Sequence, residues 1–297
     1  MTMGFSSSDF AAALKAGASI SAEDVLAVRR WVWPDGSVSA EEAEALFALN
    51  RAAKASAPEW ADFFIEAMTD YVVNQTPPRG YVEDGHAAWL IGQIEQDGAP
   101  ITPTELALVV KVLEAALNAP ASLKAWALGQ IEQSVLADGR VGEQEAASLR
   151  RIVFAAAGGG ALTVSADEAE LLWRIKDACV QADNAPGWKT LFVQAVGNHL
   201  MAYSSYTPLE RSEAARLDAF VADHHRSVLG FFARMGSTNP SEVRAALAQK
   251  SHGDHDAAVA AAGAVTPAED QWLQTHIDAD GARDPYEEAL LAFVAEN

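Results

Sequence analysis

Two stretches of the chain repeat each other, and this duplication limits the possible folds more than any other feature. One stretch, from Val38, reads VSAEEAEALFALNRAAKASAPEWADFFIEAMTDYVV, and the other, from Val164, reads VSADEAELLWRIKDACVQADNAPGWKTLFVQAVGNHLM. Within them Trp60 matches Trp188. A weaker third copy, from Ile101, reads ITPTELALVVKVLEAALNAPASLKAWALGQIEQSVL. A period of this length indicates stacked repeat units, because one unit alone cannot bury its apolar face.

Each copy opens with a helix-start signal, in which a hydroxyl precedes a carboxylate by three residues. The hydroxyl accepts a free backbone N–H of the first turn, and the acid favours the positive end of the helix dipole. Each such cap stabilises its helix by about 0.5–2 kcal/mol. Six starts of this kind and two close variants with Asn or Asp at the cap predict an all-helical chain. The six lie at Ser21–Asp24, Ser39–Glu42, Thr102–Glu105, Ser165–Glu168, Thr207–Glu210 and Thr266–Glu269, and the variants at Asn239–Glu242 and Asp284–Glu287.

A proline divides every copy into a helical hairpin, at Pro58, Pro120 and Pro186. Helices expected near 21–33, 83–96 and 142–157 complete three-helix units. The helix after Pro58 carries an apolar stripe at i, i+3, i+4, i+7 and i+8. Such a stripe can line a ligand groove, but this spacing favours a core. Its members are Trp60, Phe63, Phe64, Ala67 and Met68, with counterparts Trp188, Leu191, Phe192, Ala195 and Val196.

The charge balance restricts the partners. The chain has 21 Lys and Arg against 41 Asp and Glu, a net charge of −20. A nucleic-acid backbone or an anionic membrane surface would repel it. The single Cys179 excludes an internal disulfide and fits a reducing compartment. We find no apolar stretch long enough to span a membrane and no secretory signal in the first twenty residues, so a cytoplasmic location is expected.

We therefore expect an all-α fold of tandem three-helix repeat units with a small acidic helical C-terminal module. The predicted divisions are a first repeat region (1–136, two units), a duplicated repeat region (137–236) and the acidic module with its linker (237–297). The last division follows the charge, because residues 254–297 hold ten acids and one base, Arg283.

The turns before several helices share Asp-Gly, an apolar residue and then an acid. They contain Asp35-Gly36, Asp97-Gly98 and Asp138-Gly139. This turn resembles the TerB-like domain of tellurite-resistance proteins, over about residues 20–202. The resemblance implies an all-α, cytoplasmic, acidic protein of metal stress, with divalent-ion binding proposed for its acids. It would make Asp35, Asp97 and Asp138 candidate metal ligands. The alternative is a turn and helix cap alone, since glycine supplies positive φ and the acid caps the helix.

Near the C-terminus, the segment HIDADGARDPYE from His276 is similar to an EF-hand calcium loop. Calcium takes six to eight oxygens, and the loop supplies them around a glycine turn. Asp278, Asp280, Asp284 and Glu287 fit ligand positions of this loop. His276 stands where the first carboxylate belongs, and nitrogen is a poor calcium ligand. The alternative is an acidic turn capped by Asp284.

Other motifs predict little chemistry. The segment 252–256, HGDHD, has the side chains of a transition-metal clamp but lies in an Ala/Gly-rich linker. His86 and His199 are each isolated, and the adjacent His224 and His225 face different directions on a predicted helix, so they cannot easily bind one metal together. Gly158–Gly160 lacks the lysine of a phosphate loop. We find no enzyme signature.

The sequence thus predicts a cytosolic, non-enzymatic binding or scaffold protein of TerB-like character, acting in metal or envelope stress. Its partner would be a protein, and Ca²⁺ or another divalent cation at the acidic turns would bias the docking surface. One alternative is a calcium-responsive switch through the C-terminal loop. Another is an enzyme in which carboxylates from different repeat units converge.

Overall fold

The computed structural model describes residues 19–33, 36–75, 77–155, 164–201, 267–277 and 283–296. Within these ranges the chain is helical without a β-strand, so the predicted all-α class is confirmed. The α-helices are α2 (Ala22–Val32), α3 (Ala40–Ala52), α4 (Pro58–Thr69), α5 (Asp84–Ile94), α6 (Pro103–Ala115), α7 (Ala121–Asp138), α8 (Glu143–Val153), α9 (Ala166–Cys179), α10 (Pro186–Met201), α15 (Pro267–Ile277) and α16 (Pro285–Glu296).

The predicted helix starts are confirmed wherever the structure describes them. Reciprocal capping boxes begin α2, α3, α6 and α9, at Ser21, Ser39, Thr102 and Ser165. In each, the cap hydroxyl accepts the N–H three residues on, and the acid at that position accepts the N–H of the cap residue. The predicted starts at Thr207 and Asn239 lie outside the described residues.

A short backbone pairing closes each group of three helices. It joins the residue before the first helix to the connection between the second and third helices. The hydrogen bonds run from Ile20 N to Ala55 O (2.9 Å), from Val82 N to Asn118 O (2.9 Å) and from Ala185 N to Val141 O (2.7 Å). The groups α2–α4, α5–α7 and α8–α10 therefore share a local feature at the places where the sequence predicts units.

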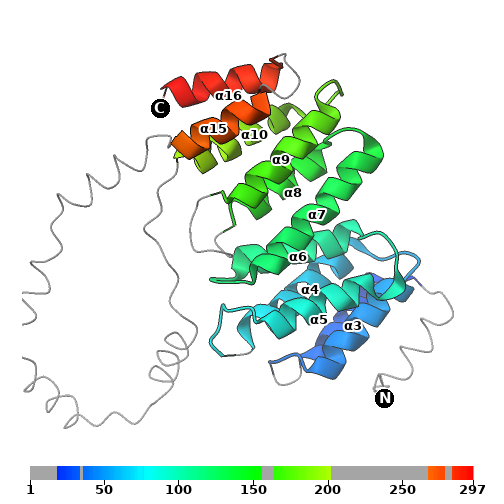
Figure 1. Cartoon of the computed structure of the whole chain (residues 1–297). Coiled ribbons are helices and arrows are strands. Elements are labelled where there is room, and N and C mark those ends of the chain that lie inside the picture. Colours follow the sequence, from blue (N-terminus) through cyan, green and yellow to red (C-terminus); the bar gives the residue numbers. More distant parts are fainter. Residues whose placement is uncertain are drawn as a thin grey trace, which may run out of the picture.

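The groups stack in chain order, from the blue end of Figure 1 to the red end. The third helix of each group packs on a helix that follows it in the chain. α4 packs on α6, α7 packs on α9, and α10 packs on α16, and we call these three contacts the junctions. One continuous apolar core runs from Ile20 to Leu290. The tandem duplication itself stays a prediction, as do the domain limits, of which 136/137 lies in the last turn of α7.

The predicted aromatic stripes form this core. Trp60, Phe64, Trp188 and Phe192 are each at most 1% exposed. Phe47 meets Phe64 edge-on at 5.1 Å between ring centroids, and Trp173 meets Phe192 likewise at 5.3 Å. The stripes therefore act as packing surfaces rather than as the lining of a groove.

Two glycines within helices give a matched test of this packing. A Cβ on Gly197 of α10 would overlap the Phe293 ring of α16, whereas a Cβ on Gly129 of α7 would meet nothing. We expect Gly197→Ala to lower the free energy of unfolding by about 1–3 kcal/mol through overpacking. Gly129→Ala should raise it by about 0.5–1 kcal/mol through helix propensity. Urea unfolding followed by circular dichroism measures both changes, and equal effects of the two variants would contradict the close contact of α16 with α10.

Candidate functional site

Lys176, near the end of α9, lies at the centre of a buried charge cluster. Its side chain is 2% exposed. The ammonium Nζ donates to Asp284 Oδ2 at 2.8 Å and to Glu287 Oε1 at 2.7 Å, and it lies 2.7 Å from Asp177 Oδ1. Asp284 and Glu287 belong to the start of α16, 108 and 111 residues further along the chain. The cluster therefore links α16 to α9 of the third group.

The two tail carboxylates also cap α16. Asp284 Oδ1 accepts the N–H of Tyr286 at 2.7 Å and of Glu287 at 3.0 Å. Glu287 Oε2 accepts the N–H of Asp284 at 3.1 Å. Each carboxylate thus uses one oxygen for the cap and the other for Lys176. The cap that the sequence predicts at Asp284 is present.

The electrostatics of the cluster favour a charged lysine. Burial alone would lower the pKa of Lys176, but hydrogen bonds to Asp177, Asp284 and Glu287 outweigh it and raise the pKa above its ordinary value. Glu287 is 2% exposed. Without Lys176 this glutamate would be a buried charge without a counterion, which is costly in a folded protein.

Of the predicted metal ligands, the structure brings Asp284 and Glu287 together, with Asp177 beside them. Oxygens of these three carboxylates lie within 4.8 Å of one another. The Lys176 ammonium is within hydrogen-bonding distance of all three groups, so a cation bound among them would displace it. Asp278 and Asp280 lie outside the described residues.

The other predicted ligands stand apart from this cluster. Asp35 lies outside the described residues, next to Gly36 with φ +84°. Asp97 is exposed, and its Oδ1 accepts the N–H of Ala99 at 2.9 Å. Asp138 is exposed at the end of α7. Gly98 and Gly139, which follow these two acids, have φ of +66° and +68°, so the turn geometry is as predicted. Metal binding at these turns stays a prediction.

Three further residues that the sequence analysis singled out, Cys179, His199 and His86, lie within the described ranges. Cys179 is buried, and burial raises the pKa of its thiol. His199 Nδ1 lies 3.0 Å from Val164 O. His86 is half-buried beside Tyr71. The segment 252–256, His224-His225 and Gly158–Gly160 lie outside the described residues.

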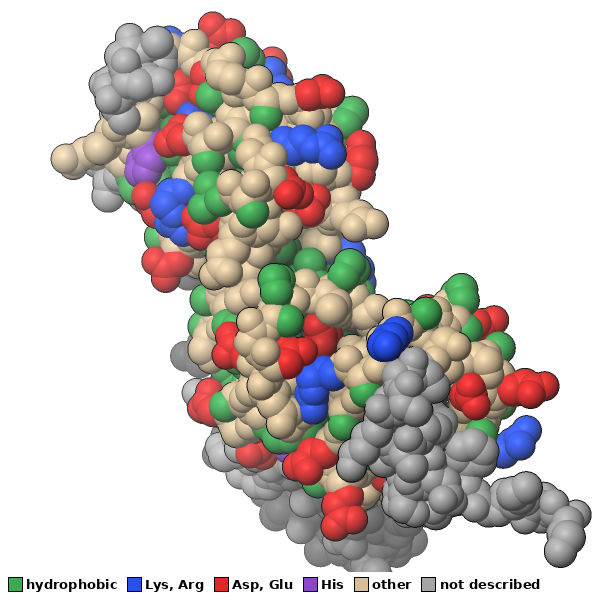
Figure 2. Space-filling model, turned by 90° about the vertical axis from the view of Figure 1, so that its right-hand side faces the viewer, with side chains coloured by type: hydrophobic (Ala, Val, Ile, Leu, Met, Phe, Trp, Pro, Cys, Tyr) green, Lys and Arg blue, Asp and Glu red, His purple; other side chains and the backbone are tan. Residues whose placement is uncertain are grey.

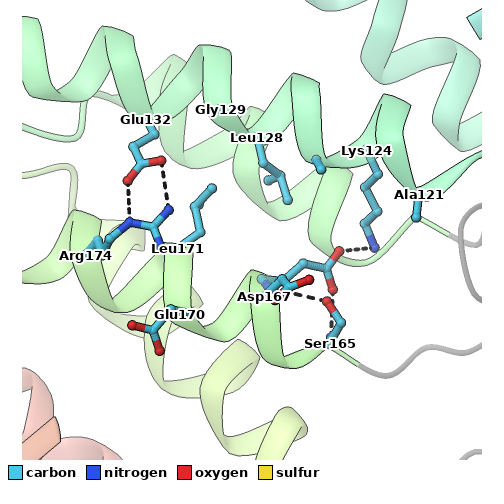
Figure 3. A pocket seen from close by; sticks show the side chains of 12 residues that line it. Ala121, Lys124, Leu128, Gly129, Glu132, Ser165, Asp167, Glu170, Leu171 and Arg174 are labelled. Atoms are coloured by element: carbon cyan, nitrogen blue, oxygen red, sulfur yellow. Dashed lines mark hydrogen bonds and ion pairs between the residues drawn. The ribbon is translucent and has the colours of Figure 1, made fainter.

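A groove of about 630 Å³ lies between α7 and α9 (Figure 3). Leu128 and Leu171 contribute apolar side chains to its lining, which also includes Ala125 and Gly129 of α7. Small residues at i and i+4 remove side-chain volume from one helix face, which leaves the space open. No motif in the sequence predicted this groove.

An ion pair stands at each end of the groove (Figure 3). Lys124 pairs with Glu168, both about nine-tenths buried, and it also donates to Val153 O at 3.2 Å. Arg174 forms a two-bonded pair with Glu132, at 2.8 and 3.0 Å. These pairs fix the separation of α7 and α9 on both sides of the open stretch.

The same interaction recurs at all three junctions. The third residue of α6, α9 and α16 is a glutamate that closes the capping box, is buried, and contacts a polar group of a preceding helix. Its partners are Asn50 for Glu105 (3.4 Å), Lys124 for Glu168 and Lys176 for Glu287. Sequence reasoning named only Glu287 as a site residue and missed both lysines. A lysine within a run of core residues was the available signal, as in SLKAWALG and LWRIKDAC.

Comparisons with protein-family models, curated proteins and solved structures give no match. None of the described helices is both long enough and apolar enough to cross a membrane. On the face in Figure 2, acidic side chains are scattered widely and basic ones lie among them.

The Lys176 cluster predicts a large and specific effect on stability. Lys176→Met leaves Glu287 buried and unpaired, so the free energy of unfolding should fall by about 3–5 kcal/mol. Because the folded pKa of Lys176 is raised, this contribution is complete below about pH 10.4 and is lost only at higher pH. Urea unfolding at pH 7 and pH 9 should therefore give the same difference from the unmodified protein.

Asp177→Asn is the matched control, since the Asp177 side chain is 60% exposed and its pair with Lys176 is worth little. The double variant Lys176→Met/Glu287→Leu should recover most of the loss, because it removes both buried charges. A double variant as unstable as Lys176→Met alone would contradict the pairing.

Proposed function

We propose that this protein is a cytosolic, non-enzymatic binding protein whose stacked helices present the α7–α9 groove to a protein partner. The observation that carries the proposal is the groove itself, a recess between two ion pairs whose lining combines Leu128 and Leu171 with charged side chains of α7 and α9. Ligand sites in proteins are typically concave and apolar with a few placed charges. The TerB-like turns add a role in metal or envelope stress, which rests on the resemblance alone.

The groove favours a partner segment with apolar side chains and a cationic group. Leu128 and Leu171 supply apolar contact, and the carboxylates of Asp167 and Glu170 lie on the α9 side. Glu170 Oε2 lies 3.0 Å from His276 Nε2, so this carboxylate already meets an imidazole ring within the chain itself. The net charge of −20 draws cationic partners and repels nucleic acid.

Filling the groove tests this proposal. Ala125→Phe places a ring on an exposed α7 position that lines the groove, while Ala137→Phe places the same ring on an exposed α7 position outside it. We expect a protein captured from extracts of the expressing cells to bind the unmodified chain and Ala137→Phe, and to lose at least about tenfold in affinity for Ala125→Phe, which is about 1.4 kcal/mol. Equal binding by all three chains in a titration would contradict a role for the groove.

A second candidate function is a divalent-cation switch, which the approach of Asp177, Asp284 and Glu287 favours. An ion taken by these carboxylates would displace the Lys176 ammonium and would itself bridge Asp177 of α9 to the two carboxylates of α16. The contact between the tail and α9 would then depend on the ion.

Thermal unfolding of the chelator-treated protein with Ca²⁺, Mg²⁺, Mn²⁺ or Zn²⁺, at fixed ionic strength, tests the switch. An ion at about 100 times its dissociation constant would stabilise the fold by roughly 2.7 kcal/mol. The switch predicts a selective shift that Asp177→Asn abolishes. A shift lost instead with Asp97→Asn and Asp138→Asn would assign the ion to the TerB-like turns, and no shift with any ion would contradict both sites.

A further inference from the structure

Helices α15 and α16 repeat the pattern of α5 and α6. Trp272, Leu273 and Ile277 of α15 match Trp89, Leu90 and Ile94 of α5 in order and spacing. Leu273 and Ile277 are buried, as are Leu90 and Ile94. After α15, as after α5, the chain continues through Asp-Gly into a capping box. The acid of this box is Glu287 at the start of α16 and Glu105 at the start of α6.

The contacts of the two pairs agree as well. Trp89 meets Phe47 of α3 edge-on, with ring centroids 5.6 Å apart at 84°. Trp272 meets Trp173 of α9, the counterpart of Phe47, at 5.6 Å and 82°. Glu287 is held by Lys176 where Glu105 is held by Asn50. α15 and α16 therefore occupy the places of the first two helices of a fourth unit.

The third helix of this unit has no counterpart among the described residues. α6 packs on α4 on one side and on α7 and α8 on the other, whereas the packing of α16 within the described part of the chain is chiefly on α10. Figure 1 shows α16 on the outer edge of the stack. The consequence is visible in burial. Val109, Val110, Val112 and Leu113 of α6 are all 0% exposed. Of their counterparts on α16, Leu291 and Val294 are partly buried against the core, and Ala292 and Ala295 are exposed.

The third helices of the other units define what covers this face. Each carries buried apolar residues at i, i+4, i+8 and i+12, a stripe that winds slowly around the helix. The stripes are Trp60, Phe64, Met68 and Val72; Leu123, Ala127, Ile131 and Val135; and Trp188, Phe192, Val196 and Leu200. An aromatic or aliphatic residue begins each stripe, and smaller aliphatic residues end it.

We propose that the face of α16 formed by Leu291, Ala292, Val294 and Ala295 is a docking surface for one amphipathic helix of a protein partner, with apolar residues at i, i+4, i+8 and i+12 and Lys or Arg at its flanks. The partner helix takes the place that α7 takes against α6. This is the helix-in-groove mode of recognition. Glu288 and Glu296 are exposed on α16, so the borders of the face are acidic and favour basic flanks. The same net charge of −20 disfavours a second copy of this chain as the occupant. The surface is separate from the α7–α9 groove, and the proposal stands without it.

The test measures the binding of a fluorescein-labelled synthetic peptide to the full chain. The peptide has the sequence of residues 118–138, which contains α7. A second peptide carries Gln133→Lys and Ser134→Lys, at positions that are exposed in α7. Fluorescence anisotropy should show saturable binding of both peptides, with the basic peptide binding more tightly at low salt. Ala292→Glu and Leu291→Glu in the protein should weaken binding at least about tenfold, since a charge would enter the apolar contact.

Leu26→Glu is the matched control, because Leu26 is a 54% exposed leucine on α2, far along the chain from α16. It should leave the affinity unchanged. Ala292 is exposed, so Ala292→Glu keeps the test valid even if Leu291→Glu alters the fold. Absence of saturable binding by either peptide, or equal weakening by Leu26→Glu and Ala292→Glu, would overturn the proposal. Neither result bears on the α7–α9 groove, whose own test uses Ala125→Phe.

Discussion

The stack of helices depends on glutamates that are buried where one unit meets the next. Glu105, Glu168 and Glu287 are each at most 7% exposed, and each closes the first turn of the helix that enters the junction. A carboxylate in such a place is tolerated only with hydrogen bonds and a counter-group. The capping box supplies the hydrogen bonds locally, and the preceding unit supplies Asn50, Lys124 or Lys176. Helix start and helix packing are therefore coupled through one side chain.

The capping boxes were predictable from the sequence, and the pairing of their glutamates with residues of preceding helices was not. A capping box spans four residues, so its cap residue and its acid identify it directly, and helix starts and core stripes follow the predictions closely. Lys176 and Glu287 are 111 residues apart. No short pattern joins them, because the contact exists only after α16 has packed on α10. The groove likewise arises from Ala125 and Gly129 on α7 facing Leu171 on α9, and neither helix indicates it alone.

The C-terminal motif shows why a spacing can support two interpretations. Asp284 and Glu287 have the separation of the last two ligands of a calcium loop, and they have equally the separation of a cap residue and its third-position acid. In the structure one oxygen of each accepts backbone N–H groups and the other faces Lys176. Sequence spacing cannot distinguish a cation from an ammonium group that arrives from another helix. The observed partner depends on tertiary packing.

The residue that pairs with the buried glutamate does not come from the same helix position at all three junctions. Lys176 occupies in α9 the place that Asn50 occupies in α3. The indole Nε1 of Trp60 donates to Asn50, whereas that of Trp188 has no hydrogen-bond partner among the described residues. In the second unit the same place is Leu113, and Lys124 on the next helix serves instead. The acid is a glutamate at every junction, so the three junctions differ in the counter-group alone: it is a neutral amide at the first junction and an ammonium at the other two.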